Sequence, residues 1–117
     1  MNNKFYVSFE TARLLKEKGY RQTYHAYYFG NSNLRKGGYR GDSWYDSPDF
    51  YPAPTKAEVI DWLEGKINIS IRYYDLTSKW HYDITPVRTG VKEINNLSFS
   101  TRLEAEEAAI IDALELL

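Results

Sequence analysis

The sequence of 117 residues contains no cysteine. This absence excludes disulfides, thiol nucleophiles and thiolate zinc sites, and it suits a reducing cytoplasm. Long apolar runs are also lacking, both after Met1, where a signal segment would lie, and along the rest of the chain. We therefore expect a cytoplasmic protein with no membrane partner, folded as a single domain over residues 1–117.

Excess charge is almost absent overall, since the formal net charge is -1. Its distribution is uneven. Residues 1–41 hold eight basic and two acidic side chains, a balance of +6, and residues 42–117 hold seven basic and fourteen acidic ones, a balance of -7. Three explanations stay open: an acidic or nucleic-acid partner for the basic part, association between copies, or mutual neutralisation within one fold.

Three segments begin with helix-capping residues. Ser8 precedes a run of good helix formers, and Thr55 and Thr101 are each followed three residues later by a glutamate, which is the pattern of a capping box. The sequence therefore predicts helices over residues 8–19, 55–65 and 101–117. The last helix is expected to pack on a sheet and to expose to solvent an acidic face made up of Glu104, Glu106, Glu107, Asp112 and Glu115.

Strand patterns occupy three further segments. Residues 21–29 are rich in aromatic side chains and have apolar groups on both faces, as in a central strand. Residues 67–73 and 79–85 alternate apolar and polar side chains, so they predict a hairpin that turns at residues 75–78 and has one wet face. A short initial strand at residues 4–7 stays open.

The order of these elements indicates an α+β fold. A small, mainly antiparallel sheet of three or four strands is expected to pack against two or three helices. The buried face of this sheet is expected to carry the apolar residues of the hairpin, namely Ile69, Ile71, Trp80, Tyr82 and Ile84.

Residues 30–54 lack periodicity and are rich in glycine, asparagine, serine, aspartate and proline, so they predict a long loop. The second half of this loop is too aromatic for ordinary disorder. We expect Phe50 and Tyr51 to pack against the core, and Pro52 and Pro54 to restrain the entry into the next helix.

The same loop carries the candidate binding site. Over residues 31–45, cationic side chains that suit phosphates are interleaved with aromatic rings that suit bases. The candidate binding residues are Arg35, Lys36, Tyr39, Arg40, Trp44 and Tyr45. Three interpretations stay open: rings that cover the sheet, a single-stranded nucleic-acid site, or a surface for a protein partner.

Residues with catalytic chemistry are few. His81 and Asp83 alternate onto the wet face of the hairpin as a possible base and orienting carboxylate, but no nucleophile or oxyanion-hole motif accompanies them. His25 is the only other histidine, and its spacing from His81 matches no known metal site. We expect no catalytic residue, metal or cofactor, and we expect His81 and Asp83 to be exposed.

Two segments carry a family resemblance. FYVSFETARLLKEKGY and YPAPTKAEVIDWLEGK, followed by an acidic terminal helix rich in alanine and leucine, resemble small proteins encoded by phages and integrated mobile elements of gut bacteria. The resemblance implies a mobile-element origin and no mechanism. The sequence thus favours a non-enzymatic accessory or protein-interaction module that binds a protein partner or a second copy of itself. The alternative is single-stranded nucleic-acid binding through residues 31–45, and a more distant one is a small hydrolase using His81 and Asp83.

Overall fold

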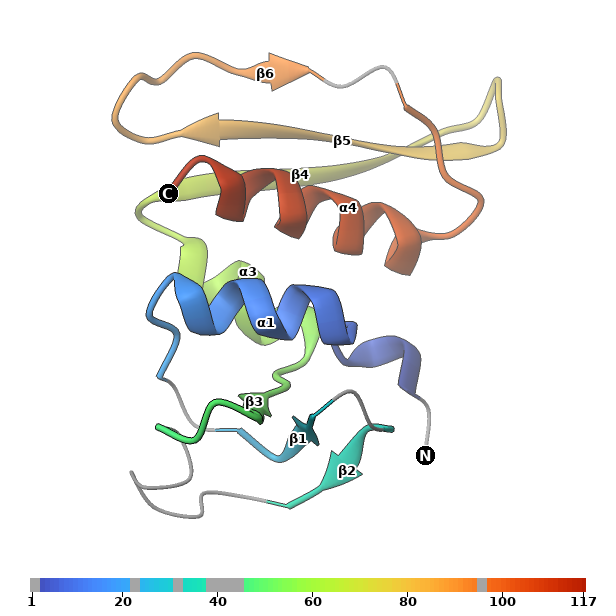
Figure 1. Cartoon of the computed structure of the whole chain (residues 1–117). Coiled ribbons are helices and arrows are strands. Elements are labelled where there is room, and N and C mark those ends of the chain that lie inside the picture. Colours follow the sequence, from blue (N-terminus) through green and yellow to red (C-terminus); the bar gives the residue numbers. More distant parts are fainter. Residues whose placement is uncertain (1–2, 22–23, 31–32, 38–45, 95–96) are drawn as a thin grey trace. The chain divides into compact units, whose positions relative to one another are not determined.

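The computed structural model describes residues 3–21, 24–30, 33–37, 46–94 and 97–117. The chain divides into two compact units, Met1–Thr55 and Lys56–Leu117, and each contains a three-stranded antiparallel sheet (Figure 1). The predicted α+β class is confirmed, although the described strands belong to two sheets rather than to one. The expectation of a single domain stays a prediction.

The first unit begins with a 3-10 helix, Asn3–Phe5, so a regular initial strand is not formed there. Helix α1, Phe9–Glu17, follows directly after its N-cap. The side-chain oxygen of Ser8 accepts a hydrogen bond from the Thr11 N–H at 3.3 Å, which satisfies one of the free amides of the first turn. Beyond the helix, Gly19 has a φ of +86°, a backbone conformation that glycine adopts readily. Both boundary signals of this predicted helix are confirmed.

The sheet of the first unit has the order β2-β1-β3. Strand β1, Ala26–Phe29, is central, which agrees with the apolar residues on both of its faces, but it begins later than predicted. Strands β2, Arg35–Lys36, and β3, Phe50–Pro52, lie within the segment predicted to be one long loop, so that prediction is wrong for these five residues. Both are short edge strands, and an edge is the place in a sheet where Pro52 is tolerated.

Aromatic rings fill the core of the first unit. Phe50 is fully buried, and its ring centroid lies 5.5 Å from that of Tyr24 and 5.3 Å from that of Tyr27. Tyr51 is half-buried and meets the ring of Phe9 edge-on at 5.3 Å. The prediction that Phe50 and Tyr51 pack against the core is confirmed.

The second unit consists of two helices and the second sheet, whose order is β4-β5-β6. Helix α4 packs on strands β4 and β5. The predicted helices and hairpin are confirmed, and the short third strand is an addition to them. The elements are α3, Lys56–Leu63; β4, Ile67–Tyr74; β5, Lys79–Pro86; β6, Glu93–Ile94; and α4, Arg102–Glu115.

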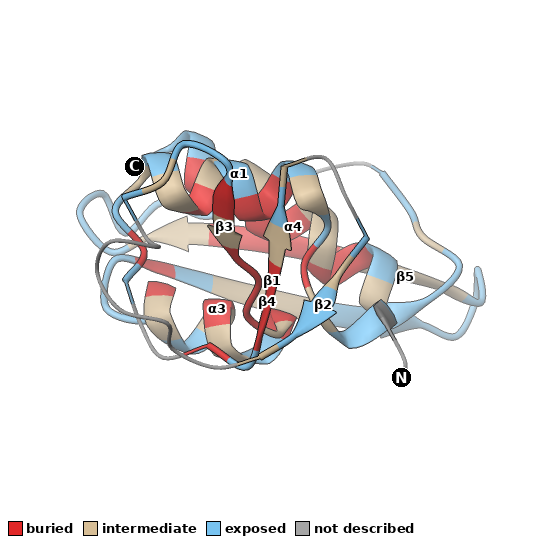
Figure 2. Cartoon of the chain, turned by 60° about the horizontal axis from the view of Figure 1, so that its bottom comes forward, coloured by how far each residue is buried: buried red, intermediate tan, exposed pale blue. Residues whose placement is uncertain are grey.

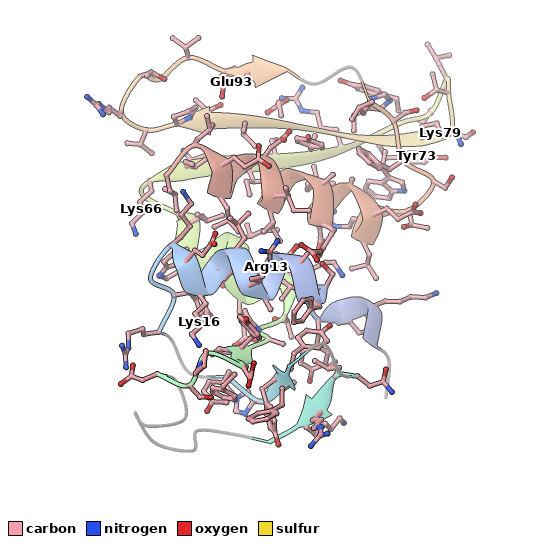
Figure 3. All side chains as sticks on the ribbon, viewed as in Figure 1. Arg13, Lys16, Lys66, Tyr73, Lys79 and Glu93 are labelled. Atoms are coloured by element: carbon pink, nitrogen blue, oxygen red, sulfur yellow. The ribbon has the colours of Figure 1, made fainter. Side chains whose placement is uncertain are left out.

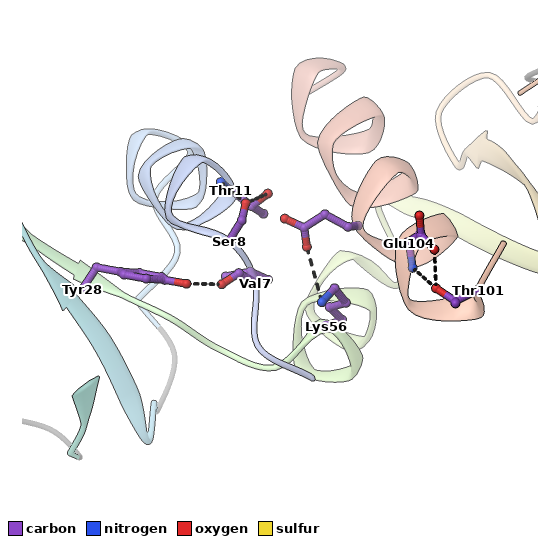
Figure 4. Close-up of polar contacts among 8 residues, drawn as sticks. Val7, Ser8, Thr11, Tyr28, Lys56, Thr101 and Glu104 are labelled. Atoms are coloured by element: carbon purple, nitrogen blue, oxygen red, sulfur yellow. Dashed lines mark hydrogen bonds and ion pairs between the residues drawn. The ribbon is translucent and has the colours of Figure 1, made fainter. Parts of the chain in front are cut away.

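Helix α4 is capped as predicted and packs through small residues. Thr101 Oγ1 accepts from the Glu104 N–H at 3.2 Å and donates to Glu104 Oε1 at 2.9 Å (Figure 4). The residues buried along the helix include three alanines, which allow close approach to the sheet: Ala105, Ala109 and Ala113.

The acidic face of α4 is less solvated than expected. Glu106 is buried because it lies one turn before Ile110 on the packed stripe, and its carboxylate approaches Arg102 Nε at 3.5 Å. Asp112 is half-buried and accepts a hydrogen bond from the Tyr82 hydroxyl. Glu107 is half-buried too, and its Oε2 lies 3.8 Å from Lys56 Nζ of α3. The expectation of a fully solvated acidic face is therefore wrong at Glu106, Glu107 and Asp112.

Candidate functional site

The turn end of the β4–β5 hairpin exposes three large side chains that contain apolar surface. Tyr73 and Tyr74 are each 46% exposed, and Leu76 is 102% exposed. Figure 1 shows this turn beyond the N-terminal end of α4, and Figure 2 shows it in the colour of exposed residues. We call Tyr73, Tyr74 and Leu76 the hairpin tip.

Local hydrogen bonds hold the turn in place. The Ser78 N–H donates to the Tyr74 carbonyl at 2.9 Å, and Thr77 Oγ1 donates to the same oxygen at 3.3 Å. Ser78 has a φ of +56°, in the left-handed region that closes many tight turns. Leu76 is therefore displayed by an ordered turn. Its signal in the sequence was a large aliphatic residue between Asp75 and Thr77, in a segment that otherwise carries polar turn residues.

Ring contacts support the two tyrosines of the hairpin tip. The Tyr73 ring lies 5.1 Å from that of Trp80, and the Tyr74 ring lies 4.6 Å from that of His81. The Arg102 guanidinium carbon lies 5.7 Å from the Trp80 ring centroid. Side chains held in this way lose little rotational freedom when a partner binds, so they are suited to act as anchors.

Polar groups surround the hairpin tip. Lys79 follows the turn, and its Nζ lies 3.4 Å from Ser100 Oγ. Tyr73 and Lys79 project from the same end of the sheet (Figure 3). Arg72 and Asp75 are also exposed next to the tyrosines. An apolar centre with a charged margin is the composition of many protein interfaces.

The structure brings His81 and Asp83 onto one sheet face but does not join them. No hydrogen bond links these two described side chains. Arg72 Nη2 lies 2.9 Å from Asp83 Oδ2, and the Nε2 of His81 is buried without a hydrogen-bond partner in the described part of the chain. The expectation that both residues are exposed is wrong: Asp83 is buried and His81 is half-buried. Arg72 and Lys92 approach the Asp83 carboxylate from neighbouring segments. The alternation of apolar and polar residues does not reveal such contacts.

Two of the six predicted binding residues can be placed. Arg35 and Lys36 form β2, where they pair with Tyr27 and Ala26 of β1, and both side chains are exposed. The remaining four, Tyr39, Arg40, Trp44 and Tyr45, lie outside the described residues. The basic and aromatic site therefore stays a prediction.

Lys16 of α1 is a polar anchor that the sequence did not reveal. Its Nζ donates to the carbonyl oxygens of Ser47 at 2.5 Å and Phe50 at 2.7 Å, and it lies 5.1 Å from the Tyr51 ring centroid. Burial lowers the pKa of this amine below its ordinary value, and the carboxylates of two nearby aspartates oppose that shift. Lys16 thus links helix α1 to the start of β3 and to the residues just before it.

Within the described ranges, no three histidine, aspartate or glutamate side chains lie close enough together to hold a metal ion. The same ranges contain no helix that is both long and apolar enough to cross a membrane.

No family model, curated protein or solved structure matches this chain. The resemblance to proteins of phages and mobile elements therefore stays a prediction.

Proposed function

We propose that this chain is a non-enzymatic protein-interaction module that binds a protein partner through the hairpin tip. The observation that carries the proposal is the complete exposure of Leu76 on an ordered turn that directly follows two half-exposed tyrosines. A large aliphatic side chain in water is unfavourable by about 2 kcal/mol relative to a buried one. Insertion of Leu76 into an apolar pocket would recover that free energy.

The composition of the hairpin tip supports this role. Tyrosine, tryptophan and arginine are the residues that most often dominate binding energy at protein interfaces. All three types occur here, since Trp80 supports Tyr73 and Arg102 lies over Trp80. The expected pocket of the partner is apolar and has an acidic margin, which would face Arg72 and Lys79.

The arrangement of His81 and Asp83 supports a non-enzymatic role. The hydrolase alternative uses Asp83 to orient His81 as a general base, and here the Asp83 carboxylate is engaged by Arg72 at 2.9 Å. The proposal places the module in the cytoplasm, where a chain without cysteine needs no disulfide for stability. It also assigns the module an accessory role in a phage or mobile element, as the resemblance of its sequence implies.

Site-specific photo-crosslinking tests the proposal. A photoreactive amino acid at position 76 should capture one protein in cells that naturally encode the chain, whereas the same group at position 89, in the exposed connection after β5, should not. The captured protein is then purified and its affinity measured by calorimetry. Capture of nothing specific at position 76 contradicts the proposal.

Two variants at neighbouring turn positions form the matched comparison. Leu76→Asp should weaken binding by at least about tenfold, because a carboxylate cannot enter an apolar pocket. Thr77→Asp adds the same charge beside it and should change affinity by less than about threefold. Equal affinities for the parent and Leu76→Asp would overturn the proposal.

A further inference from the structure

The second sheet is open, and its two outer strands are β4 and β6. Strand β4 pairs with β5 over eight residues, and no other described strand pairs with it. The other side of β5 is occupied by β6 and by a bridge between Trp80 and Phe99. The eight-residue edge of β4 is therefore the longer of the two outer edges of this sheet, since β6 has two residues.

The register establishes which backbone groups face this edge. Trp80 exchanges both of its backbone hydrogen bonds with Phe99, at 2.8 and 2.9 Å, so its N–H and C=O point away from β4. Tyr73 lies opposite Trp80, and these two residues exchange no backbone hydrogen bonds with each other. The N–H and C=O of Tyr73 therefore point away from β5, toward the open edge. By alternation, the amides and carbonyls of Ile69 and Ile71 face the same open edge.

Strand β4 carries few of the features that usually prevent edge pairing. Outer strands are commonly protected by prolines, by bulges or by lysines. Residues 67–74 contain no proline or lysine, and their pairing with β5 runs through eight consecutive residues without a bulge. The single charge in this strand, Arg72, is held at 2.9 Å by Asp83, which lies on the side away from the open edge.

We infer that β4 pairs antiparallel with the β4 strand of a second copy of this chain, about a two-fold axis at Ile71. This register places Ile71 opposite its own counterpart and Ile69 of each copy opposite Tyr73 of the other. All three are positions whose backbone groups face the edge, so the pairing forms about six hydrogen bonds. The sheets of the two copies join into one sheet of six strands.

The side chains of β4 are self-complementary in this register. On one face, Ile69 meets Tyr73 of the other copy, and pairs of β-branched and aromatic residues are favourable across strands. On the other face, Arg72 meets the uncharged Ser70, so no like charges are brought together. A two-fold pairing also closes on itself, because each copy uses its own β4 edge and no further copy can add to that edge.

This inference goes beyond the proposed function because it uses the backbone edge of β4, which includes Tyr73 of the hairpin tip but not Leu76. Multi-angle light scattering over a concentration series up to about 1 mM tests it, since weak pairing appears only at high concentration. The parent should approach twice the 13.7 kDa mass of one chain. Leu76→Asp should dimerise like the parent, so loss of partner binding and loss of the dimer are separate results.

A proline at the axis removes the pairing specifically. Ile71→Pro deletes an N–H that faces the open edge and leaves the hydrogen bonds to β5 in place. It should remain monomeric over the whole series, whereas Ile71→Ala, which also loses side-chain volume, should still dimerise. A monomeric parent, or a dimeric Ile71→Pro variant, would overturn the inference.

Cysteine crosslinking covers the case in which the proline variant does not fold. In the inferred register, the two Cα atoms at position 71 are about 5.5 Å apart, within the disulfide range of about 4.4 to 6.8 Å. Because the chain has no cysteine of its own, Ile71→Cys should yield one disulfide-linked dimer on mild oxidation. Ser70→Cys, whose counterpart lies diagonally, should crosslink far more slowly, and equal rates would contradict the register.

Discussion

Arg72 and Asp83 form an ion pair diagonally across the β4–β5 hairpin, with Arg72 Nη2 lying 2.9 Å from Asp83 Oδ2. Lys92, just before β6, approaches the same oxygen at 3.9 Å. The Asp83 side chain is only 10% exposed, whereas the arginine is 43% exposed. A nearly buried carboxylate thus depends on two cations from either side of its strand, and its removal should affect the whole sheet.

Asp83→Asn tests this dependence. We expect the free energy of unfolding to fall by about 1–3 kcal/mol, because the amide keeps the shape but removes the charge that pairs both cations. Asp75→Asn, at an exposed position of the turn, is the control and should change it by less than about 0.5 kcal/mol. Urea unfolding measures both. If Asp83→Asn and Asp75→Asn lower the free energy of unfolding equally, Asp83 behaves as an exposed residue, as the sequence pattern predicted.

Lys16 allows a prediction of how the stability of the chain changes with pH. Its pKa is lower in the folded chain than in the unfolded chain, so the unfolded chain binds the proton more tightly. The stability contributed by Lys16 is therefore fully present above the ordinary lysine value of 10.5 and is lost as the pH falls through the folded pKa.

The comparison of Lys16→Met with the parent tests that sign. The variant should lose about 1 kcal/mol of stability because it leaves the carbonyls of Ser47 and Phe50 without their donor. This deficit should grow as the pH rises from neutral toward 10.5. Lys4→Met, at an exposed position, should show no such trend in urea unfolding. A deficit that shrinks on raising the pH would contradict the assigned cause.

Two helix caps test the expectation of a single domain. Ser8→Ala and Thr101→Ala should each cost about 1 kcal/mol, since each hydroxyl accepts from an amide of the first helical turn. The caps lie in different units, each of which spans roughly half the chain and would be marginal alone. We expect one thermal transition, which both variants shift to lower temperature. If each variant shifts only one of two transitions, the units fold independently.

The basic residues of the predicted binding site need a test under varied salt. Joint replacement of Arg35, Lys36 and Arg40 by alanine should abolish any binding of a single-stranded oligonucleotide that the parent shows. Such binding should weaken steeply as salt rises, because it releases counterions from phosphates. Fluorescence anisotropy at low and high salt provides the measurement. If parent and variant behave alike, these three residues have no electrostatic role in nucleic-acid binding.

Features governed by neighbours in the sequence could be predicted. The caps at Ser8 and Thr101 and the alternation along β4 and β5 each depend on residues within a few positions of one another. Capping and strand alternation are local, so the helices and the hairpin were predicted near their observed positions. The two short strands within residues 30–54 were missed because two or three residues have no periodicity to detect.

The sequence by itself determined the helices, the hairpin, the α+β class and a chain without thiol chemistry. Tertiary structure alone decided that the described strands form two sheets, that Asp83 and Glu106 are buried, and that Leu76 is exposed at the end of a turn. Local patterns assign a side chain to one face of its own element. Whether that face meets solvent, a cation or another strand depends on segments far away in the chain, which no short pattern encodes.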